Sequence, residues 1–219
     1  MFKNAKYEAT GETKDWFGTT LYRIRAVADI AALGIVAGTL GGWISSEKNL
    51  QVSGNAWVSG NAWVSGNAWV YGDAWVYGNA RVSGNAWVYG DAWVYGDAWV
   101  YGNARVYGNA WVYGNARVSG DAWVYGNARV SGNAQVSGDA WVYGVNITAT
   151  RSDNYTFLVA PTSEGPRIIA GCRYFTFDEA RAHWVNTRGG KQLGDESLAL
   201  VDHLERMAVL NGFMEPVRA

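Results

Sequence analysis

A six-residue unit, repeated without interruption, most constrains what this chain can fold into. Between Leu50 and Gly144 the pattern is V-[SY]-G-[ND]-A-[WRQ], with valine at every sixth position from Val52 to Val142 and alanine two residues before every valine after the first. Within a unit, Ala-Trp-Val-Tyr alternates small and large residues, which is the two-residue period of a β-strand. A Gly-Asn or Gly-Asp pair then ends the strand, because both residues tolerate a positive φ.

Such short strands bury too little surface to be stable alone, so successive units must wind into coils that stack. Alanine and valine share one face of each strand, and their small size indicates a narrow, tightly packed interior. Tryptophan, arginine and tyrosine are too large for that interior. We therefore expect all of them on the outside of the stack.

The repeat of a small residue two positions before an aliphatic one, every six residues, resembles the hexapeptide repeats of left-handed parallel β-helices. The resemblance covers the array, residues 51–144. It implies a mainly β fold in which three units form one triangular coil, with about five coils stacked about 4.8 Å apart. Homotrimers are common in that family, so the resemblance also makes a homo-oligomer, a trimer or a dimer, an expected assembly.

Three units per coil place the outward residues on three columns, and these are the candidate partner-binding residues. The first column holds Trp57, Trp75, Trp93 and Trp111, the second Trp63, Arg81, Trp99 and Arg117, and the third Trp69, Trp87, Arg105 and Trp123. Tyrosines on separate columns add Tyr89, Tyr95 and Tyr107. So large an exposed apolar area is typical of an interface. The alternative, that the ladders only brace the solenoid through stacked rings and arginine–aromatic contacts, stays open.

The two ends differ from the array and predict three parts: an N-terminal β cap at 1–50, the β-helix at 51–144 and a small ββαα domain at 145–219. Residues 21–27 favour a strand and residues 41–44 a first rung. This opening, with its Gly-Gly-Trp segment, is similar to bacterial and phage-borne hexapeptide proteins. The apolar run at 26–44 is long enough for a membrane span, but Asp29 would cost about 3 kcal/mol there. We therefore expect no membrane segment.

In the C-terminal part, residues 154–163 and 166–175 each favour a strand. Residues 176–188 favour a helix with Thr176 as N-cap and Glu179 completing a capping box. A second helix is expected at 195–212, ending at Gly212, with apolar residues at helical spacing: Leu198, Val201, Leu204 and Ala208. This part is similar to small C-terminal modules of phage and prophage proteins.

Residues with catalytic chemistry are scarce. Hexapeptide acyltransferases use a histidine base near the coils, and hexapeptide carbonic anhydrases hold zinc with three histidines. This chain has two, His183 and His203, both outside the array. We expect no catalytic residue, no metal and no cofactor. Cys172, the single cysteine, lies in an apolar strand and is expected to be buried and inert.

Charged residues in the array also have a structural explanation. Aspartate replaces asparagine at some turns, where the two residues are interchangeable, so we expect turn formers rather than cation sites. The arginines are scattered over three columns and the net charge is −1, which disfavours nucleic acid as a partner. The lone cysteine suits a reducing compartment, so the cytoplasm of a bacterial host is expected, with a virion-associated location as the alternative.

Together these observations predict a non-enzymatic interaction protein of phage or prophage type. Its exposed Trp, Tyr and Arg ladders would bind a host protein and could inhibit a defence system. Three alternatives remain. The chain could be a structural component of a trimeric fibre or spike, an acyltransferase-like enzyme in which His183 or His203 reaches a coil face, or a carbohydrate binder that stacks tryptophan on sugar rings.

Overall fold

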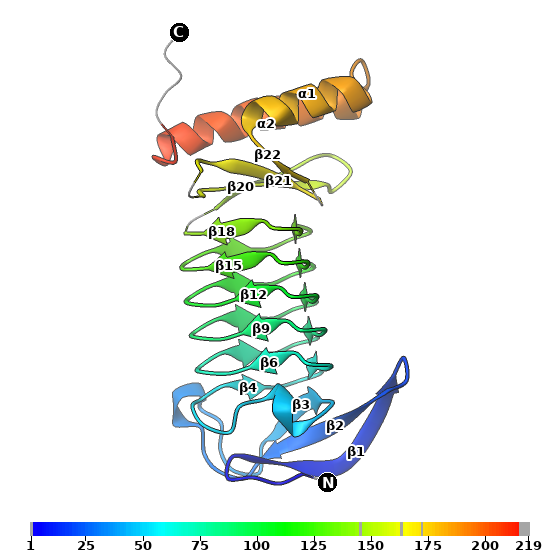
Figure 1. Cartoon of the computed structure of the whole chain (residues 1–219), viewed down its shortest axis with the longest axis vertical. Coiled ribbons are helices and arrows are strands. Elements are labelled where there is room, and N and C mark those ends of the chain that lie inside the picture. The colour runs from blue at the N-terminus through cyan, green and yellow to red at the C-terminus, as the bar shows by residue number, and fades with distance from the viewer. Residues whose placement is uncertain (1, 145, 163, 172, 215–219) are drawn as a thin grey trace.

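The computed structural model describes residues 2–144, 146–162, 164–171 and 173–214 and is mainly β. A column of stacked coils forms the body of the molecule (Figure 1). The N-terminal strands lie at one end of the column, and a small sheet with two helices lies at the other. The predicted architecture, a mainly β solenoid with a C-terminal two-helix module, is therefore confirmed. Its left-handed sense stays a prediction.

The solenoid consists of short parallel strands arranged in three sheets, one for each side of the coil. The first sheet holds β4 (Trp57–Val58), β7 (Trp75–Val76), β10 (Trp93–Val94), β13 (Trp111–Val112) and β16 (Arg129–Val130). The second holds β5 (Trp63–Val64), β8 (Arg81–Val82), β11 (Trp99–Val100), β14 (Arg117–Val118) and β17 (Gln135–Val136). The third holds β6 (Trp69–Val70), β9 (Trp87–Val88), β12 (Arg105–Val106), β15 (Trp123–Tyr125) and β18 (Trp141–Tyr143).

Each strand pairs with the strand three units further along, so the predicted columns are confirmed. Trp57, for example, pairs with Trp75 at the same position of the next coil. With a preceding rung at the N-terminal end, the stack has about six turns rather than the five that we expected. The repeat glycines from Gly54 to Gly144 all have φ between 62° and 74°, which explains why a glycine occupies every turn.

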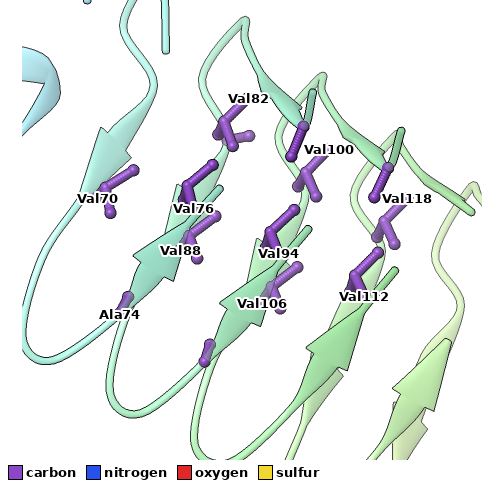
Figure 2. Packing of buried hydrophobic residues seen from close by; sticks show 14 of the residues in the cluster. Val70, Ala74, Val76, Val82, Val88, Val94, Val100, Val106, Val112 and Val118 are labelled. Carbon is purple, nitrogen blue, oxygen red and sulfur yellow. The ribbon is translucent and has the colours of Figure 1, made fainter. Parts of the chain in front are cut away.

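The interior is built from alanine and valine, as the alternation predicted. Every valine from Val58 to Val142 is fully buried, and the alanines from Ala56 to Ala140 are at most 1% exposed. Figure 2 shows valines of successive coils stacked above one another inside the solenoid. Small side chains at these positions let the three sheets approach closely. Because the same residues recur in register, each coil packs on the next in the same way.

The first valine of the array departs from this pattern. Val52 is 37% exposed, and Leu50 takes its place in the interior by bridging to Val70 of the next coil. The expectation that Val52 faces inward was wrong. The first turn is longer than the others, and its extra residues place Val52 outside the coil.

Three N-terminal strands extend the second sheet: β1 (Tyr7–Trp16), β2 (Thr19–Ala26) and β3 (Leu40–Ile44). The sheet order is β1-β2-β3-β5, with β3 parallel to β5, so the predicted strand at 21–27 and first rung at 41–44 are both confirmed. The glycine pair in β3 has a packing reason. A Cβ on Gly41 would lie 2.6 Å from Ile24 and 2.8 Å from Trp57, and one on Gly42 would lie 2.6 Å from a backbone oxygen.

The apolar run at 26–44 folds as the end of β2, a short 3₁₀ turn η1 (Ala31–Leu33) and β3. A second 3₁₀ turn, η2 (Glu47–Asn49), leads into the first coil. In the described part of the chain, no helix is both long and apolar enough to cross a bilayer.

The C-terminal part contains four strands rather than the two that we expected. They are β19 (Ile147–Thr150), β20 (Thr156–Ala160), β21 (Arg167–Ala170) and β22 (Arg173–Phe175). The segment 166–175, expected to be one strand, reverses direction around Gly171, whose φ is 63°. The strand β19 was missed because it is short and only half-buried.

Both predicted helices are confirmed. The helix α1 (Phe177–Arg188) begins with the expected capping box, in which the Thr176 hydroxyl and the Glu179 side chain each bond the other residue's backbone N–H. The helix α2 (Gln192–Leu210) begins one turn earlier than expected. Its predicted apolar positions Val201, Leu204 and Ala208 are buried.

The four-stranded sheet closes the end of the array. Along β20 and β21 the side chains alternate between two cores. Leu158 and Ile169 join the core of the solenoid, whereas Phe157 and Ile168 pack against α1 and α2. Figure 1 shows this sheet lying between the last coil and the two helices.

Candidate binding face on the solenoid

The three sheets separate the candidate residues onto three faces that cannot act as one site. The face formed by β6, β9, β12, β15 and β18 has the most continuous aromatic surface. We call it the tyrosine face, and it consists of Trp69, Tyr71, Trp87, Tyr89, Arg105, Tyr107, Trp123, Tyr125, Trp141 and Tyr143.

An unbroken tyrosine column runs along this face. Centroid distances are 4.7 Å from Tyr71 to Tyr89, 4.7 Å from Tyr89 to Tyr107, 5.1 Å from Tyr107 to Tyr125 and 5.6 Å from Tyr125 to Tyr143. Neighbouring ring planes differ by at most 26°. The spacing follows the separation of hydrogen-bonded strands, so the register of the coils creates the ladder directly.

A tryptophan and arginine column lies beside the tyrosines. The Arg105 guanidinium lies 5.0 Å from the Trp87 ring centroid and 4.7 Å from that of Trp123, so one cation is held between two indoles. Beyond it, Trp123 and Trp141 stack at 5.0 Å. The two columns touch, because the Tyr107 and Trp123 centroids are 6.2 Å apart. The face is therefore one continuous surface.

The stacking determines which parts of the rings remain available. Flat faces of neighbouring tyrosines cover one another, so ring edges and hydroxyls are left for solvent. Trp87 and Trp141 are 37% and 42% exposed and are the most open indoles of this face. Burial among the rings raises the pKa of Tyr89 and Tyr107 above the usual value of 10.

The other two faces are less continuous. On the first sheet, Tyr77, Tyr95 and Tyr113 stack at 4.8 Å and 5.0 Å. On the second, Tyr101 is the single tyrosine of its column, and serines occupy the equivalent positions. There the Trp99 Nε1 donates a hydrogen bond to a serine hydroxyl at 3.3 Å.

Two candidate tryptophans are covered, which corrects the expectation that every array tryptophan is presented on the outside. Trp57 is fully buried and Trp63 is 5% exposed. Trp57 packs beside Gly41 of β3, and Trp63 lies 5.5 Å from Trp16 of β1. The N-terminal strands therefore cover the first turn: Trp57 belongs to the core of the solenoid and Trp63 lies against β1, so neither is part of a binding face.

Aspartates at the turns behave as turn formers. The Asn79 side chain donates to Asp97 at 3.0 Å, and Asn103 donates to Asp121 at 2.8 Å, so each of these carboxylates accepts a hydrogen bond from an amide of the preceding coil. Among the described residues, no group of three or more His, Cys, Asp or Glu side chains could hold a metal ion.

The structure places both histidines in the C-terminal helices. The His183 ring packs at a tilt against Phe175, with centroids 5.1 Å apart, and meets Trp184 edge-on at 4.8 Å. Burial, and to a lesser degree Arg173 and Arg188, lower the pKa of His183. His203 is exposed on α2. Neither histidine is brought onto a coil face, which the acyltransferase alternative requires. Cys172 lies outside the described residues, so its expected burial stays a prediction.

The candidate list omitted members of the tyrosine face that the structure adds, namely Tyr71, Tyr125, Tyr143 and Trp141. Their signal was present in the sequence, because each lies a whole number of coils from a residue already chosen. The tyrosine face continues beyond the middle of the array to β18 in the last coil.

Comparison with known families is in accord with this architecture. Six segments match the family model for the YdcK β-solenoid repeat, at residues 50–66, 74–90, 80–102, 98–114, 110–126 and 122–138. The matches stay within the array and leave both ends of the chain unassigned. No curated protein matches the chain significantly. The match and the coil geometry agree that this chain is a repeat β-solenoid protein.

Proposed function

We propose that this protein is a non-enzymatic interaction protein that binds a protein partner through the tyrosine face. The observation that carries the proposal is the unbroken column of five stacked tyrosines, in contact with a tryptophan and arginine column. Five rungs extend over about 20 Å, which suits one side of a standard protein–protein interface.

The composition of this face favours a protein partner. Tyrosine, tryptophan and arginine are the residues that most often dominate protein-binding energy. Each is already held in place, as Arg105 is between two indoles. A surface that is rigid before binding loses little side-chain entropy when the partner arrives, so more of the contact energy contributes to affinity.

The same stacking disfavours carbohydrate and single-stranded nucleic acid. Both ligands bind aromatic residues through open ring faces. Here the faces of Tyr89 and Tyr107 lie against neighbouring tyrosines, and those of Trp87 and Trp123 lie near Arg105. The hydroxyls and ring edges that remain are suited to hydrogen bonds and edge contacts with a protein surface.

The origin and location form part of the proposal. The N-terminal segment is similar to bacterial and phage-borne hexapeptide proteins and the C-terminal module to phage and prophage proteins, and these resemblances support a protein that acts in the cytoplasm of a bacterial host. Its partner would then be a host protein, and covering that protein's surface would inhibit it, as an inhibitor of a defence system does. The alternative is a homo-oligomer, a trimer or dimer, in which the tyrosine face packs against a second copy as in a fibre or spike.

The test compares two matched double variants. Tyr107→Phe with Arg105→Gln removes a hydroxyl and a charge from the tyrosine face while keeping the ring stack. Tyr101→Phe with Arg117→Gln makes the same chemical changes on the second face, where Arg117 lies 5.9 Å from an indole.

A partner is first isolated with the wild-type protein from host cells and purified, and its affinity for each variant is then measured by calorimetry. We expect the tyrosine-face variant to weaken binding about tenfold or more, because it removes central contacts, and the control to bind as wild type does. Equal affinities for both variants would overturn the proposal. A defined oligomer of this chain that dissociates only in the tyrosine-face variant would replace the host partner with a second copy.

A further inference from the structure

A pocket lies in the C-terminal module, and none of its lining residues belongs to the tyrosine face. It is an open pocket of about 410 Å³ whose lining includes Arg151, Arg173, His183, Trp184, Arg188 and Lys191. We propose that this pocket binds a phosphate monoester. The inference is independent of the proposed function, because it rests on different residues.

The pocket carries an excess of positive charge. Among the described residues, no carboxylate lies within 4.0 Å of the charged groups of Arg173, Arg188 or Lys191, and no acidic side chain lines the pocket. Elsewhere in the module, Arg167 pairs with one carboxylate and Arg181 with three. The three cations of the pocket therefore lack the carboxylate partners that Arg167 and Arg181 have.

Arg151 has a different role in the same pocket. Its side chain is 2% exposed, and Asp153 neutralises it through an ion pair of 2.7 Å. The Ser197 hydroxyl accepts a further bond from it at 2.8 Å. These bonds hold the Arg151 side chain in place at one side of the pocket. The unneutralised positive charge that a ligand meets therefore comes from Arg173, Arg188 and Lys191.

A buried donor adds to this arrangement. Trp184 lines the pocket and is 4% exposed, and its Nε1–H has no hydrogen-bond acceptor among the described residues. The Arg151 and Arg188 guanidinium groups lie 5.5 Å and 6.0 Å from its ring centroid. An unused buried donor among cations is satisfied by a ligand rich in acceptors, since leaving such a group unpaired has a free-energy cost.

The backbone supplies positive potential as well. The 19-residue helix α2 begins at Gln192, directly after Lys191, and its N-cap makes no side-chain capping bond. The N-terminus of a helix carries partial positive charge and free N–H groups, which favour anions. Burial and the charges of Arg173 and Arg188 lower the pKa of His183, which is the effect expected where cations gather without counter-charge.

These features select a phosphate monoester over a simple carboxylate. A phosphate monoester carries close to two negative charges at neutral pH and three acceptor oxygens, which matches several unpaired cations around one group. Arginine forks bind such oxygens two at a time. The volume of about 410 Å³ also has room for an organic group of sugar or nucleoside size attached to the phosphate.

The experiment is calorimetric titration of the full-length protein with inorganic phosphate and with adenosine 5′-monophosphate, at constant ionic strength maintained with sodium chloride. The test variant is Arg188→Gln with Lys191→Gln, and Arg173→Gln is a second, single variant on a surface strand. The matched control is Arg206→Gln, an exposed arginine of α2 outside the pocket. Far-UV circular dichroism and thermal melting establish that each variant is folded.

We expect one saturable site in the wild type, weakened about tenfold or more in the double variant, weakened in Arg173→Gln and unchanged in Arg206→Gln. Binding also raises the pKa of His183, measured by NMR, because a dianion offsets the nearby arginines. If the nucleotide binds more tightly than inorganic phosphate, the ligand is an ester. If the two bind equally, the pocket recognises the phosphate group alone. Absence of saturable binding, or equal weakening in Arg206→Gln, overturns the proposal.

Discussion

Replacing Gly96 with alanine probes the stacking of coils directly. Gly96 has φ of +70°, a conformation that costs an L residue about 1–2 kcal/mol. A Cβ there would also lie 3.0 Å from the Gly114 nitrogen and 3.3 Å from its oxygen in the next coil. Both contacts are with backbone, which cannot rotate away, and such overpacking costs about 1–3 kcal/mol. We therefore expect Gly96→Ala to lower the free energy of unfolding by about 2–5 kcal/mol.

Gly132 supplies the matched control, because its φ is +62° and no described atom lies within 4 Å of the position of its Cβ. Gly132→Ala should cost only the conformational term of about 1–2 kcal/mol. Urea unfolding followed by far-UV circular dichroism gives both values, and similar slopes make the midpoints comparable. Equal destabilisation by the two substitutions would refute the reasoning that contact between coils limits the turn to glycine.

Three further predictions concern the two ends of the solenoid and the C-terminal module. Trp57→Ala should destabilise the protein by about 3–5 kcal/mol, because this indole is fully buried. Trp141→Ala should cost about 1 kcal/mol, because that indole is 42% exposed. Urea unfolding of both variants measures the difference. Asn49→Ala should cost at least about 2 kcal/mol by the same assay, since the buried amide donates to two carbonyls of the next coil at 3.0 Å and 2.8 Å. The Arg151 guanidinium lowers the pKa of Asp153 from 3.8 to about 2, so this pair's stabilisation should be complete above pH 3.8 and lost as the pH falls through about 2. Unfolding measured across that range should show a smaller acid dependence in Asp153→Asn, and an unchanged dependence would contradict the assignment.

The body of the fold could be predicted from the sequence because each unit repeats the same local rule. Strand alternation places Val100 and its equivalents inside, and a turn glycine such as Gly96 recurs after every strand. With three units per coil, the pairing of Trp69 with Trp87 follows by counting. In such an array each unit contacts the equivalent units of neighbouring coils, so the repeat pattern predicts the long-range strand pairs as well as the strands themselves.

Features that depend on contact between different parts of the chain could not be predicted in this way. The burial of Trp57 depends on β3, which precedes the array in the sequence and packs against the indole through Gly41. The exposure of Val52 depends on a longer first turn, set by the bridge between Leu50 and Val70. Neither feature alters the six-residue pattern itself.

The two candidate surfaces also differ in how far the sequence alone could predict them. The tyrosine column was visible in the sequence as one tyrosine in every third unit, but the covering of its ring faces by one another required the geometry. The pocket of the C-terminal module had no local signal. Its cations Arg151, Arg173 and Arg188 come from separate segments of the module, and only the packing of α1 on the sheet brings them together.

The central claim is that the tyrosine face, rather than another side of the solenoid, contacts a protein partner. Site-specific photo-crosslinking tests it most directly, with p-benzoylphenylalanine placed at Tyr89 on this face, at Tyr95 on the first face and at Tyr101 on the second. In the cells that produce the protein, the account predicts a single heteromolecular adduct from position 89 and none from positions 95 and 101. Adducts from the other two positions alone, or from all three equally, would contradict it.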